Sequence, residues 1–138
     1  MNPTYSTKFR VPFGDVDMLG HVNNIRYLAY FENARTEHLF SIAGMGRFDE
    51  IGLIIAHAEI DYKSPAEFRD ELRIDLRTAS VGNSSWVYEY EVFNETNSRL
   101  VATGKTVQVA YDYKTEKSIP IPNEFREKLL EEIASLQK

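Results

Sequence analysis

The sequence predicts an α+β fold in which an antiparallel five-stranded sheet wraps around one long central helix. One long segment with helical spacing follows a first strand, and four segments with a two-residue period come after it. Short polar connections between those four strands imply antiparallel pairing. A single sheet must cover its apolar face, and one long helix can do so. Because no repeat or Pro/Gly-rich linker divides the 138 residues, residues 1–138 are expected to form one domain.

The first strand is expected over residues 5–13, where alternate residues share one side of a two-residue period. These residues are Tyr5, Thr7, Phe9, Val11 and Phe13. Residues 14–23 lack a clear period and carry two glycines, two aspartates and a histidine. They are therefore expected to form a polar loop.

The long helix is expected over residues 24–43, where intervals of three and four residues begin. Two neighbouring stripes run along it, one of Ile25, Leu28, Glu32, Arg35, Leu39 and Ile42, the other of Tyr27, Phe31, Ala34 and His38. Because these stripes cover more than one face, other structure is expected to wrap the helix. Glu32 and Arg35 have the spacing of an ion pair. Asn23 suits the N-cap, and Gly44 suits the stop.

Four strands are expected after this helix, because the two-residue period returns. They cover residues 53–62, 72–79, 86–93 and 100–111. Turn-forming residues such as Gly82-Asn83 separate them. A short C-terminal helix is expected to follow Pro122, with an amphipathic face of Phe125, Leu129, Ile133 and Leu136.

Composition excludes several classes of function. The absence of cysteine excludes disulfides, iron–sulfur clusters and a cysteine nucleophile. The net charge of −5 and the lack of a Lys/Arg run argue against nucleic-acid binding. Three scattered histidines without a helical pair predict no metal site. No apolar run approaches the ~20 residues that span a bilayer, and no signal-peptide core is found, so a cytoplasmic protein is expected.

The polar loop before the long helix concentrates the groups that could carry chemistry. Asp15, Asp17, His21 and the pair Asn23-Asn24 precede the first helical turn. Backbone N–H groups of a first turn lack helical partners and lie at the positive end of the dipole, so they can stabilise the oxyanion of a carbonyl under attack. A nearby carboxylate can attack that carbonyl or deprotonate water. The alternative is a loop whose Asp and Asn side chains only cap backbone N–H groups.

Three segments of the sequence resemble one family of enzymes. They read Asp15-x-Asp17-x-x-Gly20-His21-Val22-Asn23-Asn24 with Tyr27-x-x-Tyr30-Phe31-Glu32-x-Ala34-Arg35, then Glu59-x-Asp61-Tyr62-x-x-Pro65-Ala66, then Asp70-Glu71-Leu72. Together they closely resemble the 4-hydroxybenzoyl-CoA thioesterase-like branch of the hotdog-fold acyl-CoA thioesterases, over roughly residues 8–113. The order of strand, helix and four strands agrees with a hotdog fold without use of these motifs.

The resemblance implies hydrolysis of an acyl-CoA thioester to the free acid and CoA, without metal or organic cofactor. It places the catalytic carboxylate on Asp17, as nucleophile or as general base, and the carbonyl-polarising backbone N–H at the start of the helix, near Asn24. Some members carry His or Tyr where this chain has Asn24, which bears on substrate choice. The resemblance gives Asp15 no chemistry, and His21 is expected to orient Asp17, line the acyl pocket or stabilise the loop.

Further residues are candidates for substrate binding. They come from the polar loop and from regions with which the family binds its substrate. The residues are Gly20, His21, Val22, Asn23, Tyr27, His57, Ser84 and Ser85. His57 is expected to share one strand face with Leu53, Ile55 and Glu59, where a histidine can equally be a core group. The turn at Ser84 offers hydroxyl and N–H groups to the CoA arm, although an ordinary solvated turn has the same composition.

The resemblance also implies an oligomer. Relatives pair their sheets edge to edge into a homodimer, or stack dimers into a homotetramer, with the active site between subunits. Acyl-CoA is then the expected partner, with neither nucleic acid nor membrane. The alternative is a non-catalytic acyl-CoA-binding or sensor module of the same fold. The sequence leaves open the length and the aromatic or aliphatic character of the acyl group, and whether CoA or acyl carrier protein carries it.

Overall fold

The computed structural model describes residues 1–43 and 52–136, so the predicted helix stop at Gly44 lies outside the described residues. In chain order the elements are strand β1 (Tyr5–Arg10), the short 3-10 helix η1 (Phe13–Asp15), helix α1 (Arg26–Ala43), strands β2 (Leu53–Tyr62), β3 (Glu71–Val81), β4 (Ser85–Asn94), β5 (Arg99–Asp112) and β6 (Lys117–Ser118), and helix α2 (Asn123–Leu136). The predicted α+β class is confirmed. The prediction of five strands missed β6, a two-residue strand that pairs with β5. Within the described part of the chain, no helix has the length and apolar character needed to cross a bilayer.

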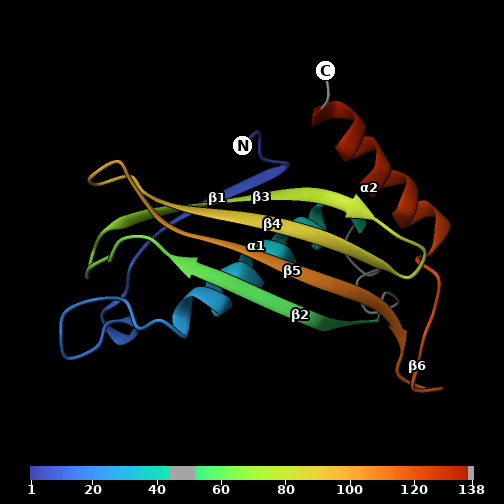
Figure 1. Cartoon of the computed structure of the whole chain (residues 1–138), viewed down its shortest axis with the longest axis horizontal. Helices are drawn as coiled ribbons and strands as arrows, with labels where there is room; N and C mark the ends of the chain where they lie inside the picture. The colour runs from blue at the N-terminus through green and yellow to red at the C-terminus, as the bar shows by residue number, and fades with distance from the viewer. Residues whose placement is uncertain (44–51, 137–138) are drawn as a thin grey trace.

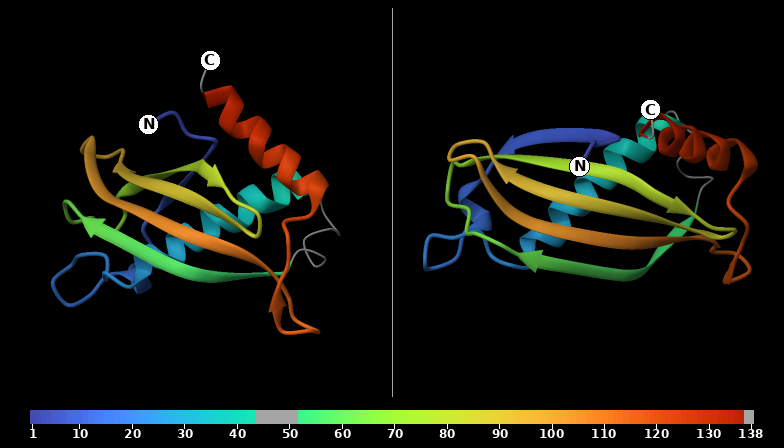
Figure 2. Two further views of the ribbon diagram at one scale, coloured as in Figure 1. Left: turned by 45° about the vertical axis from the view of Figure 1, so that its right-hand side comes forward. Right: turned by 45° about the horizontal axis from the view of Figure 1, so that its top comes forward.

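The strands pair antiparallel in the order β1-β3-β4-β5-β2. The sheet curves around α1, which crosses its inner side, as Figure 1 and the two views of Figure 2 show. Helix α2 packs against β3 near the end where that strand stops. One core therefore lies between α1 and the sheet, and β1 and β2 form the two edges.

The end of β1 and the start of α1 differ from the prediction. Strand β1 ends at Arg10 rather than at residue 13, because Pro12 has no N–H to donate and the chain turns into η1. Helix α1 begins at Arg26, two residues later than predicted. Asn23 forms the turn that leads into it, since its Oδ1 accepts from the Ile25 N–H (3.2 Å) and its C=O accepts from the Arg26 N–H (2.9 Å).

The aromatic stripe of β4 is fully buried, with Tyr88 and Tyr90 against α1 and Trp86 against Phe125 of α2. Trp86 and Tyr88 are 0% exposed and Tyr90 is 1% exposed. The ring of Phe31, from α1, stacks on Tyr90 with the centroids 4.3 Å apart. Gly104 of β5 leaves the space for this ring, because a Cβ at that position would overlap it. The missing side chain thus allows α1 to approach the sheet closely.

Buried polar side chains of α1 have partners on neighbouring elements. His38 is 1% exposed, and its Nδ1 lies 2.9 Å from the Tyr88 hydroxyl. Its Nε2 lies 2.6 Å from Oε2 of Glu132 on α2. Arg35 donates from Nη1 to the Tyr90 hydroxyl of β4 (3.3 Å), and within α1 it lies 4.0 Å from Glu32, the pair that the spacing predicts. These contacts satisfy polar groups that would be costly to bury alone.

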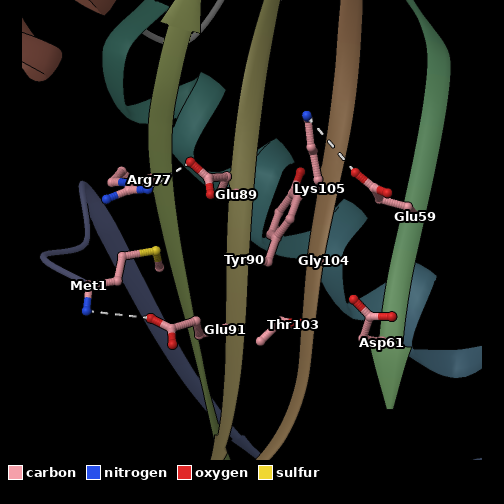
Figure 3. Close-up of a pocket in the computed structure, with 10 residues that line it drawn as sticks. All are labelled: Met1, Glu59, Asp61, Arg77, Glu89, Tyr90, Glu91, Thr103, Gly104 and Lys105. Atoms are coloured by element: carbon pink, nitrogen blue, oxygen red, sulfur yellow. Dashed lines mark hydrogen bonds and ion pairs between the residues drawn. The ribbon is translucent and has the colours of Figure 1, made fainter. Parts of the chain in front are cut away.

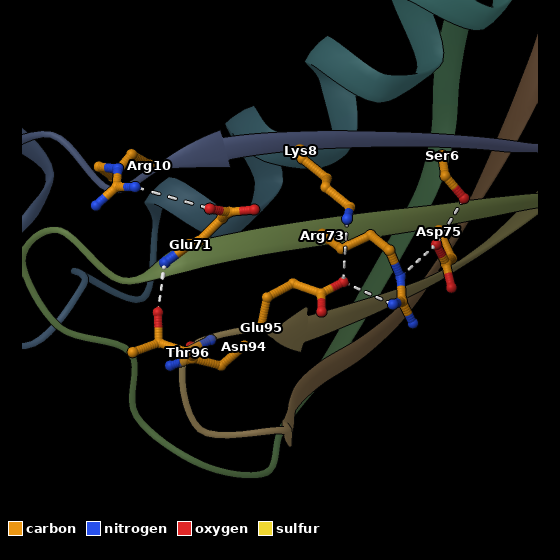
Figure 4. A network of polar contacts seen from close by, with 9 residues as sticks. All are labelled: Ser6, Lys8, Arg10, Glu71, Arg73, Asp75, Asn94, Glu95 and Thr96. Atoms are coloured by element: carbon orange, nitrogen blue, oxygen red, sulfur yellow. Dashed lines mark hydrogen bonds and ion pairs between the residues drawn. The ribbon is translucent and has the colours of Figure 1, made fainter.

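The outer face of the sheet carries polar pairs that join neighbouring strands. Arg73 contacts Asp75 (3.1 Å) and Glu95 (2.7 Å), and the Ser6 hydroxyl donates to Asp75 (2.7 Å), as Figure 4 shows. Lys8 lies 3.8 Å from Glu95. This polar face fixes the register of the strands, because a slip by one residue would turn charges toward the core.

Strand β2 is the most exposed of the five strands in the order β1-β3-β4-β5-β2. Residues 54–59 are exposed whichever face of the strand they lie on, whereas β4 alternates strictly between buried and half-buried positions. β2 also forms one edge, with β5 as its only strand neighbour among the described residues. A long exposed edge of this kind offers unpaired backbone groups to another strand.

Candidate active site

The predicted polar loop is an ordered hairpin over residues 15–23. At its base the Asn23 N–H donates to the Asp15 carbonyl (2.8 Å), and nearer the tip the Asp17 N–H donates to the His21 carbonyl (2.8 Å). Gly20 closes the tip by donating to the Asp17 carbonyl (3.0 Å). The φ of Gly20 is +82°, which a residue with a side chain rarely adopts, so the glycine is needed there.

The two oxygens of the Asp17 carboxylate differ in their hydrogen bonds. Its Oδ1 accepts from the Leu19 N–H (2.9 Å) and from the His21 N–H (3.4 Å). Its Oδ2 has no hydrogen-bond partner among the described residues, and the side chain is exposed. Oδ1 thus makes the backbone contacts that the capping interpretation predicts, whereas Oδ2 has none among the described residues.

The hairpin is attached to the segment that precedes β3. The Val22 N–H donates to the Ala66 carbonyl (2.8 Å), and His21 forms a single β-bridge with Glu67. Val22 is buried and His21 is half-buried. Large apolar side chains remain exposed around the hairpin: Phe13, Met18, Leu19, Ile25 and Phe68. An apolar surface thus surrounds the exposed Asp17.

The start of α1 lies beside the end of β2. The Tyr62 hydroxyl donates to the Asn24 carbonyl (2.9 Å). The Asn24 N–H has no acceptor among the described residues, and Asn24 is exposed. This N–H belongs to the turn before the first helical residue, where the dipole of α1 favours negative charge.

Tyr27 lies beneath the start of α1. It is 3% exposed, and its ring meets those of Tyr30 and Tyr62 edge-on, with centroids 5.7 and 5.5 Å away. Burial, followed by the neighbouring Tyr62, raises the pKa of Tyr27 to about 12. Its hydroxyl therefore stays protonated near neutral pH, and the side chain supports the site from within the core.

The prediction that His57 and Glu59 share a face with Leu53 and Ile55 is wrong. Strand β2 has a bulge between Ile55 and His57, and the extra residue reverses which face the later side chains take. His57 and Glu59 therefore lie on the outer face, exposed, with His57 Nε2 4.0 Å from Glu59 Oε2. Figure 3 shows Glu59 on this face beside Lys105, with α1 behind the sheet. Among the described residues, no three His, Asp or Glu side chains are grouped to hold a metal ion.

Ser84 and Ser85 lie at the turn between β3 and β4. The Ser84 carbonyl accepts from the Ala110 N–H (2.8 Å), and the Ser85 carbonyl accepts from the Gly82 N–H (2.7 Å). This turn is at the opposite end of the sheet from the hairpin, as Figure 1 shows. Within one chain, the structure does not bring these serines near Asp17.

Arg26 and Tyr30 contact the hairpin, and neither was predicted as part of the site. The Tyr30 hydroxyl donates to Asp15 Oδ2 (2.7 Å), and Arg26 Nε lies 3.5 Å from Asp15 Oδ1. Burial, followed by the hydrogen bond to Asp15, raises the pKa of Tyr30 well above its ordinary value. The sequence feature that could have predicted them is their four-residue spacing, which puts both on one side of the helix end nearest the two aspartates.

Comparisons with known proteins identify the family and support the fold. The family model described as "Thioesterase-like superfamily" matches residues 11–129. The long-chain acyl-CoA thioesterase FadM of Escherichia coli (strain K12) is 30% identical over 126 residues, which cover 89% of this chain and 95% of FadM. The acyl-CoA thioesterase YbgC of Haemophilus influenzae is 28% identical over 127 residues, 88% of this chain and 91% of YbgC. The crystal structure of a thioesterase from Thermus thermophilus, complexed with coenzyme A and Zn, is 31% identical, with a TM-score of 0.82, and the match covers 93% of this chain and 98% of that one.

Proposed function

The chain belongs to the thioesterase-like superfamily, and from this premise we propose that it hydrolyses acyl-CoA to the free acid and CoA, with Asp17 as the catalytic carboxylate. The observation that carries the proposal is the state of Asp17. One carboxylate oxygen is fixed by two backbone N–H groups, and the other is exposed and unpartnered among the described residues. A cytoplasmic location is part of the same proposal.

The start of α1 would stabilise the charge that develops in the reaction. The Asn24 N–H would donate to the thioester carbonyl oxygen as it becomes an oxyanion, and one such donor is worth about 2.7–4 kcal/mol. Asp17 Oδ2 would then attack the carbonyl carbon, and the CoA thiolate would leave, giving a mixed anhydride that water hydrolyses. In the second route, Asp17 takes a proton from a water that attacks the same carbon, the C–S bond breaks, and the departing CoA thiolate takes up that proton. Each route releases the acid and CoA and restores Asp17.

The remaining candidates divide by position. Gly20, His21 and Asn23 shape the hairpin and would lie along the substrate, whereas the buried Val22 and Tyr27 would support it from below. His57, on the outer face, and the serines of the β3–β4 turn require a second chain to meet Asp17. A non-catalytic sensor module explains the hairpin less well, because binding alone has no need of an unpaired carboxylate.

We place the active site between two copies of the chain. Strand β2 starts at the end of the sheet that holds the Ser84 turn and finishes at Tyr62, beside Asn24. An antiparallel pairing of β2 with β2 of a second copy turns the second sheet end for end. The partner's Ser84 turn then comes to the side of the hairpin, where it can meet the CoA arm. The exposure of β2 on both faces supports this pairing.

The proposal is tested by measuring thiol release from short-chain, long-chain and aromatic acyl-CoAs. We expect turnover of at least one class, and the ratio of kcat/KM values then ranks the acyl groups. Acyl carrier protein thioesters in the same assay decide the carrier. Binding of acyl-CoA without any thiol release would contradict the proposal and favour the sensor module.

The interface is tested by the variant Ala58→Glu in the exposed middle of β2. Two glutamates facing each other across paired strands repel, so we expect a shift from dimer or tetramer toward the 15.9 kDa monomer, with loss of activity. Light scattering of the purified protein measures the mass. Ala134→Glu on the exposed side of α2 is the control for the added charge. An active wild-type monomer, or an unchanged mass in Ala58→Glu, would exclude this interface.

A further inference from the structure

Asp15 joins the hairpin to the first turn of α1 by its side chain. Its Oδ2 accepts from the Tyr30 hydroxyl (2.7 Å), and its Oδ1 lies 3.5 Å from Arg26 Nε. The Asp15 side chain is 17% exposed, and Tyr30 is 4% exposed. One carboxylate therefore holds two side chains that are one helical turn apart, in a mostly buried position where hydrogen bonds to charged groups are strong.

The same residue joins the two strands of the hairpin by its backbone. The Asp15 carbonyl accepts from the Asn23 N–H (2.8 Å), at the residue before Asn24. Asp17 follows Asp15 by two residues on the same strand of the hairpin, and it lies across from His21. Asp15 thus lies between the carboxylate and the helix start, and it contacts the segments that carry both.

We infer that Asp15 is a positioning residue for the hydrolysis proposed above: with Tyr30 and Arg26 it fixes the Asp17 carboxylate relative to the Asn24 N–H. This inference rests on the proposed function. Attack on a carbonyl requires the reacting atoms to lie about 3–3.5 Å apart, and a misplacement of about 1 Å can cost 10²-fold in rate. Asp15 itself does not touch the reacting atoms.

The contact is maintained at neutral pH. Burial and the adjacent Asp15 charge both raise the pKa of Tyr30, so its hydroxyl keeps the proton that it donates. Arg26 carries a permanent positive charge, and Asp15 at the start of α1 is favoured by the helix dipole. The Tyr30 hydroxyl therefore remains a hydrogen-bond donor to Asp15 near neutral pH.

The test removes one hydroxyl and leaves the ring. For Tyr30→Phe we expect kcat with the best acyl-CoA to fall about 10- to 100-fold, while KM and inhibition by free CoA stay unchanged, because the substrate contacts are intact. Asp15→Asn keeps an oxygen that accepts from Tyr30, so it should retain more activity than Asp15→Ala. The double variant Asp15→Ala/Tyr30→Phe should be little worse than Asp15→Ala alone, because both remove the same contact.

The matched control is Tyr88→Phe, which removes another buried hydroxyl, the partner of His38 in the core. It should lower the free energy of unfolding without lowering kcat when both are measured below the unfolding transition. Equal kcat values in Tyr30→Phe and wild type, or equal kcat losses in Tyr30→Phe and Tyr88→Phe, would overturn the inference. An inactive wild type would instead refute the proposed function, so the two failures are distinguishable.

Discussion

Replacing Asp17 by asparagine is expected to lower kcat for acyl-CoA hydrolysis by about 10²–10⁴-fold. The amide keeps the volume of the side chain, but it can neither attack the thioester carbonyl nor take a proton from water. Its oxygen can still accept from the Leu19 N–H, so the hairpin should keep its shape. Because the wild-type side chain is exposed, the free energy of unfolding should change by less than about 0.5 kcal/mol.

Thiol release and thermal unfolding of the same preparation check both parts of this prediction. Asp112→Asn is the matched control, because Asp112 Oδ1 accepts from the Lys114 N–H (2.8 Å), the same two-residue contact as in Asp17. Backbone hydrogen bonds, first that from Lys114, lower the pKa of Asp112, so the Asp112 carboxylate is ionised at neutral pH. Asp112→Asn should keep the wild-type kcat. Undiminished turnover in Asp17→Asn would place the chemistry on another residue.

Replacing Gly104 by alanine is expected to destabilise the fold by about 1–3 kcal/mol. An added Cβ would overlap Cε2 and Cζ of Phe31 and would lie 3.1 Å from the Glu59 carbonyl oxygen. The Phe31 ring is 0% exposed and stacks on Tyr90, so it has no room to withdraw. The helix and the sheet must therefore separate locally, which exposes or loosens the core.

Urea unfolding measures this loss of stability. The urea concentration at the midpoint should fall, while the slope of the free energy of unfolding against urea concentration stays constant. Gly14→Ala is the control, because a Cβ at Gly14 has no atom within 4 Å. That substitution should leave the free energy of unfolding within about 0.5 kcal/mol of wild type. Equal midpoints for Gly104→Ala and Gly14→Ala would show that α1 does not lie against β5 as described.

The sequence determined what depends on local spacing. The three- and four-residue intervals located α1 to within two residues of its start, and the alternation of β4 identified Trp86, Tyr88 and Tyr90 as core. The motif around Asp17 located the polar hairpin next to the helix. These features follow from side-chain periodicity and turn chemistry, which act between residues that are near in the chain.

Predictions were missing or wrong for features that depend on a partner far along the chain. The β2 bulge exists only in register with β5, so simple alternation placed His57 on the wrong face. Strand β6 has only two residues, too few to show a period, and pairing with β5 makes it a strand. Pro12 could have signalled the early end of β1, because its missing N–H is a local property.

For the site, the sequence by itself determined which residue types gather before α1, and the tertiary structure decided what they contact. Only folding brings the Tyr30 hydroxyl to Asp15, leaves one oxygen of Asp17 without a partner among the described residues, and puts the Ser84 turn at the far end of the sheet. The physical reason is that periodicity reports which face of an element a side chain takes. Hydrogen bonds and strand register are decided between elements, after packing of α1 against the sheet has fixed their distances.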